Sequence, residues 1–171
     1  MKQPVIALAL LLAGIHPVLA QIQVGFSTDG TAETLVIQAL NEASQSLDLA
    51  AYAFTSTPVA NAVYGAYRRG VKVRVLADAR YAREHKSAVT TLANLGVPVR
   101  INSRYKIQHN KFALINNEII QTGSLNYTKA ALSGENAENV LVIRNEPAVS
   151  QAYQREFERL WEEGEAVTAR Y

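Results

Sequence analysis

The segment LDLAAYAFTSTPVANAVYGAYRRGVKVRVLAD, residues 47–78, decides the fold class of this chain. Residues 47–54 form an apolar run typical of a buried strand, and residues 71–78 alternate in the way that predicts a second strand. The stretch between them has a helix-capping residue in Thr57 and a helix-ending residue in Gly70. A strand, a helix and another strand in this order predict a unit with two parallel strands.

The alternation continues on both sides of this unit. Upstream, residues 22–27 predict a strand and residues 28–46 predict a helix, with Thr28 or Asp29 as its cap. Downstream, residues 83–96 predict a helix and residues 97–102 predict a strand. We therefore expect one α/β domain, built on a mixed, largely parallel β-sheet with helices on both faces.

The pattern changes in HNKFALINNEIIQTGSLNYT, residues 109–128. Two short apolar strands, 111–115 and 118–122, flank Asn116 and Asn117, a pair suited to the positive φ angles of a tight hairpin turn. The remaining predicted elements are a short helix after Asn126, a strand at 139–144 and a helix at 147–161.

The first twenty residues have the features of a secretory signal peptide: a basic start, an apolar run and small residues before a cut after Ala20. A membrane anchor is the less favoured alternative, because the run is shorter than the roughly 20 apolar residues that span a bilayer. We expect residues 21–171 to form a single periplasmic or secreted domain without stable membrane insertion. The chain has no cysteine, which excludes thiolate metal sites and thiol nucleophiles.

Charge is distributed unevenly along the chain. Between Arg68 and Lys129 there are twelve Lys and Arg against three carboxylates, whereas carboxylates predominate in the flanks. One interpretation is that this basic central region attracts an anionic partner, such as a nucleic acid or an anionic lipid. The alternative is that its cations are simply dispersed over a solvated surface.

Three histidines occur in the chain, and His16 lies in the predicted signal peptide. His85 lies between two charged residues on a predicted helix, which favours an exposed polar position. His109 lies two residues before Lys111, which begins the predicted strand 111–115, so we expect their side chains to point to the same face. Two neighbouring cationic groups repel each other unless an anion lies between them, and a phosphate would fill that role.

Gly123, Ser124 and Asn126 follow the hairpin. A glycine turn exposes backbone N–H groups, and the two side chains add neutral donors, a combination that holds phosphoryl oxygens without a metal. Because a hairpin returns the chain to near its start, we expect Asn126 to lie close to His109.

These residues, in HNKFALIN and GSLN, resemble the HKD motif of the phospholipase D superfamily: His-x-Lys, four residues, Asp, six residues, Gly-Ser-x-Asn. The resemblance extends through VGFSTDG, AYAFTS, GVKVRVLAD and ENVLVIRNEP, and is strongest to the small secreted Nuc-type endonucleases of bacterial plasmids. It implies a metal-independent and cofactor-independent phosphodiesterase that cuts DNA, with RNA as a further candidate, through a covalent phosphohistidine.

In that mechanism His109 attacks phosphorus and a second histidine protonates the leaving oxygen. Lys111, Asn126 and Ser124 hold the phosphoryl oxygens. Glu138 is the acidic residue that orients the histidine, in preference to Glu135. Because the chain has one HKD copy, the resemblance implies a homodimer with a shared site; His85 is the alternative second imidazole.

The residues expected to contact the substrate flank the motif: Arg104, Tyr105, Lys106, Gly123 and Lys129. Packing is an equal alternative for Tyr105 and Tyr127. The motif Asp is Asn116 here, and its place in the hairpin turn predicts a structural role with activity retained. Two other functions stay open, namely a phospholipase acting on lipid head groups and a nucleic-acid-binding relative with weak or no activity.

Overall fold

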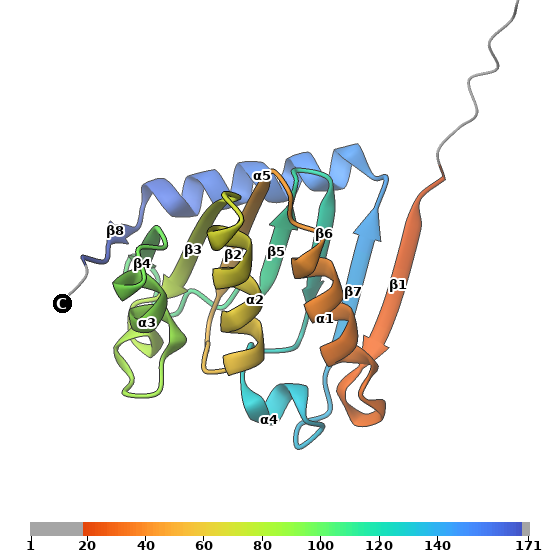
Figure 1. Cartoon of the computed structure of the whole chain (residues 1–171), viewed down its shortest axis with the longest axis horizontal. Helices are drawn as coiled ribbons and strands as arrows, with labels where there is room; N and C mark the ends of the chain where they lie inside the picture. The colour runs from red at the N-terminus through yellow and green to blue at the C-terminus, as the bar shows by residue number, and fades with distance from the viewer. Residues whose placement is uncertain (1–18, 169–171) are drawn as a thin grey trace, which may run out of the picture.

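A computed structural model describes residues 19–168, and its centre is one eight-stranded sheet between two layers of helices (Figure 1). The strand order is β1-β7-β6-β5-β2-β3-β4-β8. The strands are β1 (Gln21–Phe26), β2 (Ser46–Ala51), β3 (Lys72–Asp78), β4 (Val99–Asn102), β5 (Phe112–Ile115), β6 (Ile119–Gly123), β7 (Asn139–Arg144) and β8 (Glu165–Ala166). The helices are α1 (Thr31–Asn41), α2 (Thr57–Arg68), α3 (Ala88–Asn94), α4 (Lys129–Leu132) and α5 (Pro147–Glu162), with 3₁₀ turns at Ser27–Asp29 and Tyr81–Arg83.

The mixed sheet with helices on both faces is confirmed, but the expectation that it is largely parallel is wrong. Only β2 with β3 and β3 with β4 pair in parallel; every other neighbouring pair is antiparallel. The turn between β5 and β6 is too short for a crossover, and β7 returns antiparallel to β6 after the longer connection 124–138, which contains α4, so β5, β6 and β7 run in alternating directions. They insert between β1 and β2, so the predicted first strand pairs with β7 instead of with β2.

The hairpin turn has the predicted conformation. Asn116 and Asn117 have φ angles of 54° and 59°, and β5 pairs with β6 directly across them. All four residues of β5 are buried, so both faces of this strand are packed. β5 lies in the middle of the sheet, between the helix layers, so both of its faces need apolar side chains.

Two apolar clusters hold the layers together. The larger lies between the sheet and α1, α2 and α3, and includes Leu49 from β2. The smaller lies under α5, where Ala50, Phe112 and Phe157 are almost fully buried. Successive residues of β2 therefore serve opposite faces, as the twofold periodicity of a strand requires.

Some predicted boundaries are wrong for local reasons. The helix predicted over residues 83–96 is only the seven residues of α3, because the Ser87 side chain caps it by accepting a hydrogen bond from the amide of Val89. Ser56, and not Thr57, caps α2 in the same way. β8 is two residues long and was not predicted. The predicted signal peptide lies outside the described residues, apart from its last two positions.

Candidate active site

The candidate site lies along the edge of the sheet where β2, β3 and β4 end and β5 begins, the lower edge in Figure 1. A pocket of about 340 Å³ opens there, with His109 and Lys111 on one side and Gly123 and Ser124 on the other. Asn110, Phe112, Thr122 and Tyr153 complete its lining. The hairpin thus brings Gly123 and Ser124 to the same pocket as His109 and Lys111.

His109 and Lys111 are in direct contact. The Lys111 Nζ lies 2.9 Å from His109 Nδ1, 3.1 Å from Nε2 and 2.7 Å from the carbonyl oxygen of the same residue. Desolvation lowers the pKa of His109 and the Lys111 ammonium lowers it further, against the opposing effect of the Asp78 carboxylate. Burial also lowers the pKa of Lys111, and the negative charge of Glu138 opposes this. A lowered pKa favours the neutral imidazole, the form that can attack phosphorus.

Tyr52 packs against the imidazole and was not predicted. Its ring centroid lies 4.4 Å from that of His109 and 4.4 Å from that of Tyr81, and Lys111 Nζ lies 5.2 Å from its centre. A hydrogen bond with Tyr81 raises the pKa of Tyr52. The ring of Tyr52 is therefore held between a second tyrosine and the His109–Lys111 pair, where it limits the orientations of the imidazole.

Asp78 and Gln108 fix the loop before His109. The buried Asp78 carboxylate accepts hydrogen bonds from the backbone amides of Gln108, Arg80 and Tyr81. The Gln108 side chain accepts one from the amide of Asn110, so the loop is held on both sides of the histidine. Tyr52 directly follows the end of β2 and Asp78 ends β3, and the carboxyl ends of neighbouring parallel strands are where sites form in such sheets. That rule would have identified both residues.

Ser124 connects the other side of the pocket to Glu138. Its hydroxyl donates to Glu138 Oε2 at 2.5 Å and accepts from the amide of Asn139 at 3.0 Å. Gly123 allows this approach, because a Cβ at that position would lie 2.2 Å from the carbonyl oxygen of Asn139. A side chain at position 123 would therefore push the loop that carries Ser124 away from β7.

Glu135, the other acidic candidate, does not line this pocket, and its carboxylate accepts a hydrogen bond from Ser133. Asn126 is not among the residues that line the pocket, and its Oδ1 is buried without a hydrogen-bond partner in the described part of the chain. Leaving a buried polar atom unpaired costs about 1–3 kcal/mol, and such atoms need an explanation in a native structure. Tyr127 is a packing residue: it is fully buried and donates to Gln121 Oε1 at 2.7 Å.

The predicted substrate contacts are at the margins of the site. Arg104, Tyr105 and Lys106 lie in the exposed loop after β4. The Tyr105 hydroxyl accepts from Arg159 at 2.6 Å and donates to Glu163 at 3.2 Å, so the end of α5 holds this ring in place. Lys129 lies on α4, away from the pocket of His109, and lines a neighbouring hollow.

Two further residues occupy different surroundings from those of His109. His85 is exposed in the loop before α3 and not on a helix, because the helix starts only at Ala88. Asn116 lies at the opposite end of β5, where its side chain accepts from the amides of Ser44 and Gln45 and donates to the carbonyl of Glu42. The site is therefore built without Asn116.

Within residues 19–168, no group of three or more histidine, cysteine or acidic residues is arranged to hold a metal ion. No helix of that same range has the length and apolar character needed to cross a membrane.

Comparison with known proteins identifies the relatives of this architecture. Residues 36–161 match the family described as cardiolipin synthase, PLD-like domain. The solved structure of Nuc from Salmonella typhimurium, a phospholipase D family member, superposes with a TM-score of 0.84 at 35% identity, over 88% of this chain and 99% of that one. NucT from Helicobacter pylori has the same fold, with a TM-score of 0.78 at 21% identity over 87% of this chain and all of that one.

The curated relatives include the mitochondrial cardiolipin hydrolases. The Xenopus laevis protein is 39% identical over 141 residues, which are 82% of this chain and 66% of that protein. The human protein is 37% identical over 133 residues, 78% of this chain and 52% of that protein. This chain therefore spans between about half and two thirds of the length of these relatives.

Proposed function

Because this chain belongs to the phospholipase D superfamily of phosphodiesterases, we propose that it is a metal-independent, non-specific endonuclease that hydrolyses DNA, with RNA as a further substrate. The observation that carries the proposal is the contact between His109 and Lys111 in a pocket whose other wall is Gly123 and Ser124. A nucleophile, a cation and neutral donors face one space of about 340 Å³, the arrangement that in-line attack on a phosphodiester needs.

In the first step, the neutral imidazole of His109 attacks phosphorus, a P–N bond forms and the P–O bond to the leaving group breaks. An imidazolium on the other side of the phosphate gives its proton to the leaving oxygen. That imidazole then takes a proton from water, the water oxygen attacks phosphorus, and the P–N bond breaks to free His109. Lys111, Ser124 and Asn126 stabilise the phosphoryl oxygens through both steps.

The second imidazole is proposed to be His109 of a second copy. Within residues 19–168, the ring that packs against His109 is that of Tyr52, and His85 lies in a separate exposed loop. A twofold axis through the pocket would place two identical motifs on opposite sides of one phosphate. Glu138, whose carboxylate accepts a hydrogen bond from Ser124, would complete that shared site by orienting an imidazole.

An exposed apolar strip supports the second copy. Ile22, Val24 and Phe26 point away from α1 on the edge strand β1, and they are 61%, 55% and 47% exposed. Leu141 and Ile143 of β7 pair with this strip and continue it toward Thr122, which lines the pocket. An apolar face that is continuous with the site is well suited to be covered by a partner.

The charges around the site favour a nucleic acid as substrate. Loops 79–87 and 103–107 follow the neighbouring parallel strands β3 and β4 and carry five cations against a single carboxylate. These cations are exposed: Arg80, Arg83, Lys86, Arg104 and Lys106. A cationic margin beside the nucleophile concentrates a polyanion by releasing its counterions.

The test uses supercoiled plasmid DNA with purified residues 21–171, in excess EDTA, with a His109→Ala variant beside it. The proposal expects nicking and linearisation by the unchanged protein and none by the variant. Intact DNA with the unchanged protein rejects the endonuclease, and loss of cutting in EDTA rejects the metal-independent mechanism. Sedimentation of a Val24→Lys variant tests the dimer, which the added charge should dissociate together with the activity.

The names of the curated relatives favour a second candidate, a phosphodiesterase acting on lipid head groups. Cardiolipin vesicles in the same EDTA buffer separate the two: release of phosphatidic acid with plasmid left intact would assign the lipid reaction. Action outside the cytoplasm rests on the predicted signal peptide, and is tested by sequencing the amino terminus of the exported protein.

A further inference from the structure

Asp78 is a buried carboxylate that holds two different loops at once. It ends β3 and is only 2% exposed. Its Oδ1 accepts hydrogen bonds from the amides of Arg80 at 3.0 Å and Tyr81 at 3.1 Å, and its Oδ2 accepts one from the amide of Gln108 at 2.8 Å. A carboxylate can do this because both of its oxygens are acceptors, whereas a side-chain amide has an acceptor on one side only. The loop after β3 and the loop before His109 are therefore held by the same side chain.

These bonds close a ring of contacts around the imidazole. Tyr81, whose amide binds Asp78, places its ring 4.4 Å from the ring of Tyr52. The ring of Tyr52 lies in turn 4.4 Å from the imidazole of His109. Gln108, which binds the other oxygen of the carboxylate, directly precedes His109 in the chain. The carboxylate thus acts on the histidine by two routes, one through its backbone and the other through its aromatic face.

The charge of Asp78 also acts on His109. Desolvation and the Lys111 ammonium lower the pKa of the imidazole, and the Asp78 carboxylate opposes them. Two further groups face this pair, since Tyr52 packs against both His109 and Lys111, and the negative charge of Glu138 acts on Lys111. The carboxylate that holds the loop therefore also favours the imidazolium form of the histidine.

We propose that Asp78 is a positioning residue of this site, which holds the imidazole of His109 in line for attack and in a fixed relation to the cationic loop 79–87. This rests on the proposed attack of His109 on phosphorus and not on the identity of the substrate. The loop carries three exposed Lys and Arg, so the cations that would attract a phosphate chain and the nucleophile that attacks it are joined through one carboxylate. A displacement of reacting groups by about 1 Å can cost about 10²-fold in rate, so the loss of one acceptor here should be visible in kcat.

Asp78→Asn tests this, because it keeps the size of the side chain and one of its two acceptors. An asparagine oxygen can serve the amides of Arg80 and Tyr81 or the amide of Gln108, and on the remaining side its NH₂ group meets another N–H donor. The probe is bis(p-nitrophenyl) phosphate, a simple phosphodiester. We expect kcat to fall about 10–100-fold while KM changes by less than about threefold, because the nucleophile moves and the exposed cations remain.

The pKa of His109, followed by NMR of its imidazole, separates positioning from a general loosening of the fold. Loss of the Asp78 charge should lower this pKa, so the acidic limb of the pH profile of kcat/KM should move to lower pH. If the substitution only let water reach the imidazole, the pKa would rise instead, because desolvation is the largest cause of its lowering. The spectrum of His109→Ala assigns the signal.

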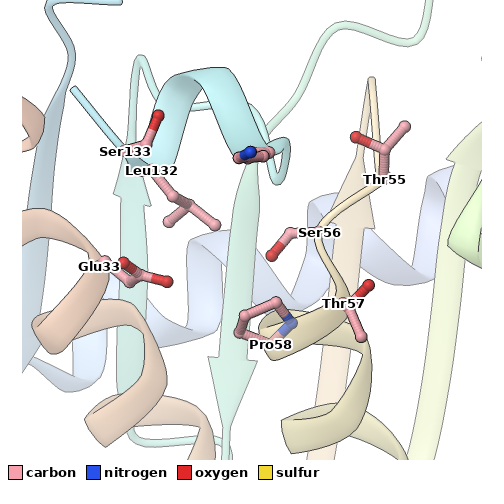
Figure 2. Close-up of a pocket in the computed structure, with 8 residues that line it drawn as sticks. Glu33, Thr55, Ser56, Thr57, Pro58, Leu132 and Ser133 are labelled. Carbon is pink, nitrogen blue, oxygen red and sulfur yellow. The ribbon is translucent and has the colours of Figure 1, made fainter. Parts of the chain in front are cut away.

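Two controls make the same chemical change elsewhere. Asp48→Asn removes a carboxylate that is 3% exposed and pairs with Arg74 of β3. Glu33→Gln removes a carboxylate that lines a second hollow of about 430 Å³, between the first turns of α1 and α2 and the helix α4 (Figure 2). The residues that line this hollow differ from those that line the pocket of His109. Both controls should keep the kcat and the His109 pKa of the unchanged protein, although loss of its ion pair should make Asp48→Asn less stable.

Tyr81→Leu tests the aromatic route, and its kcat should fall about two- to tenfold. If both routes belong to one ring of contacts, the double variant Asp78→Asn/Tyr81→Leu should lose less than the product of the two single losses. Losses that multiply would overturn the ring of contacts. If Asp78→Asn does not fold, Tyr81→Leu decides, and an unchanged kcat in that variant would overturn the proposal.

The two measurements on Asp78→Asn distinguish this proposal from the proposed function. An unchanged kcat, or a pKa of His109 that stays or rises, would overturn the role of Asp78 while leaving the phosphodiesterase in place. A protein that cleaves no phosphodiester, but in which Asp78→Asn lowers the pKa of His109, would retain the effect of Asp78 on the histidine and lose the proposed function.

Discussion

Substitutions of Asn116 distinguish a role in stability from a role in catalysis, because the family motif has Asp at this position. The Asn116 side chain makes three hydrogen bonds of 2.9–3.0 Å to the connection between α1 and β2. Each is worth about 1 kcal/mol net, and a left-handed backbone costs alanine about 1–2 kcal/mol more. Asn116→Ala should therefore lower the free energy of unfolding by about 4–5 kcal/mol.

Asn116→Asp restores the residue that the family motif has and serves as the sharper variant. A carboxylate keeps the two bonds accepted from Ser44 and Gln45 and loses the one donated to Glu42, so the loss is about 1 kcal/mol, or about 2–4 °C in Tm. Because five strand positions separate Asn116 from Lys111, about 17 Å, we expect kcat/KM to stay unchanged.

The assay combines urea unfolding, followed by the fluorescence of the single tryptophan, with plasmid cleavage by the folded variants. An Asn116→Asp protein that cuts DNA much faster than the unchanged protein would refute the reasoning, because the motif carboxylate would then act in the chemistry. Loss of activity in folded Asn116→Ala would refute it equally.

Three further changes test the site itself. Gly123→Ala should lower the free energy of unfolding by at least about 1–3 kcal/mol in a urea titration, because its Cβ would meet the carbonyl of Asn139; a neutral result would mean that the loop moves freely. Lys111→Gln removes a cation that lowers the pKa of His109, so this pKa should rise and the acidic limb of the pH profile of kcat/KM should move to higher pH. The rate should also fall about 10²–10³-fold. An acidic limb at the same pH in both proteins would contradict the effect of Lys111 on the pKa of His109. Tyr52→Leu should reduce kcat up to about tenfold through the loss of ring stacking worth about 0.5–1.5 kcal/mol, and Tyr52→Phe should restore it; equal losses in both would deny a role for the ring.

The local patterns of the sequence predicted the elements well, and β7 coincides with the predicted strand. These patterns did not predict whether neighbouring strands pair in parallel or antiparallel. Alternating strands and helices favour parallel neighbours, yet a hairpin and one further strand inserted themselves between β1 and β2. Apolar periodicity defines which face a strand buries and says little about which strand lies beside it, since β5 is buried on both faces.

The site was predictable to the extent that its residues lie close in sequence. The motif spacing placed His109, Lys111 and Ser124 around one pocket. Tyr52 and Asp78 reach His109 only through the folded sheet, and single-sequence patterns contain no direct signal for such contacts. Their position at the ends of parallel strands was the available clue.

The pairing of β1 with β7 has a consequence for the order of folding. Gln21 lies opposite Arg144, so more than 120 residues must be in place before the first strand has a neighbour in the sheet. Closing so long a loop costs entropy before any contact repays it, and non-local pairing of this kind slows folding. We expect β1 to dock last, with its amides the slowest to gain protection in pulsed hydrogen exchange; early protection of Val24 would contradict this. Because β1 is the first strand in the sequence and docks last, the edge of β7 stays unpaired for most of the folding time. During that time the apolar side chains of Ile22, Val24 and Phe26 on β1 are not yet held in the sheet.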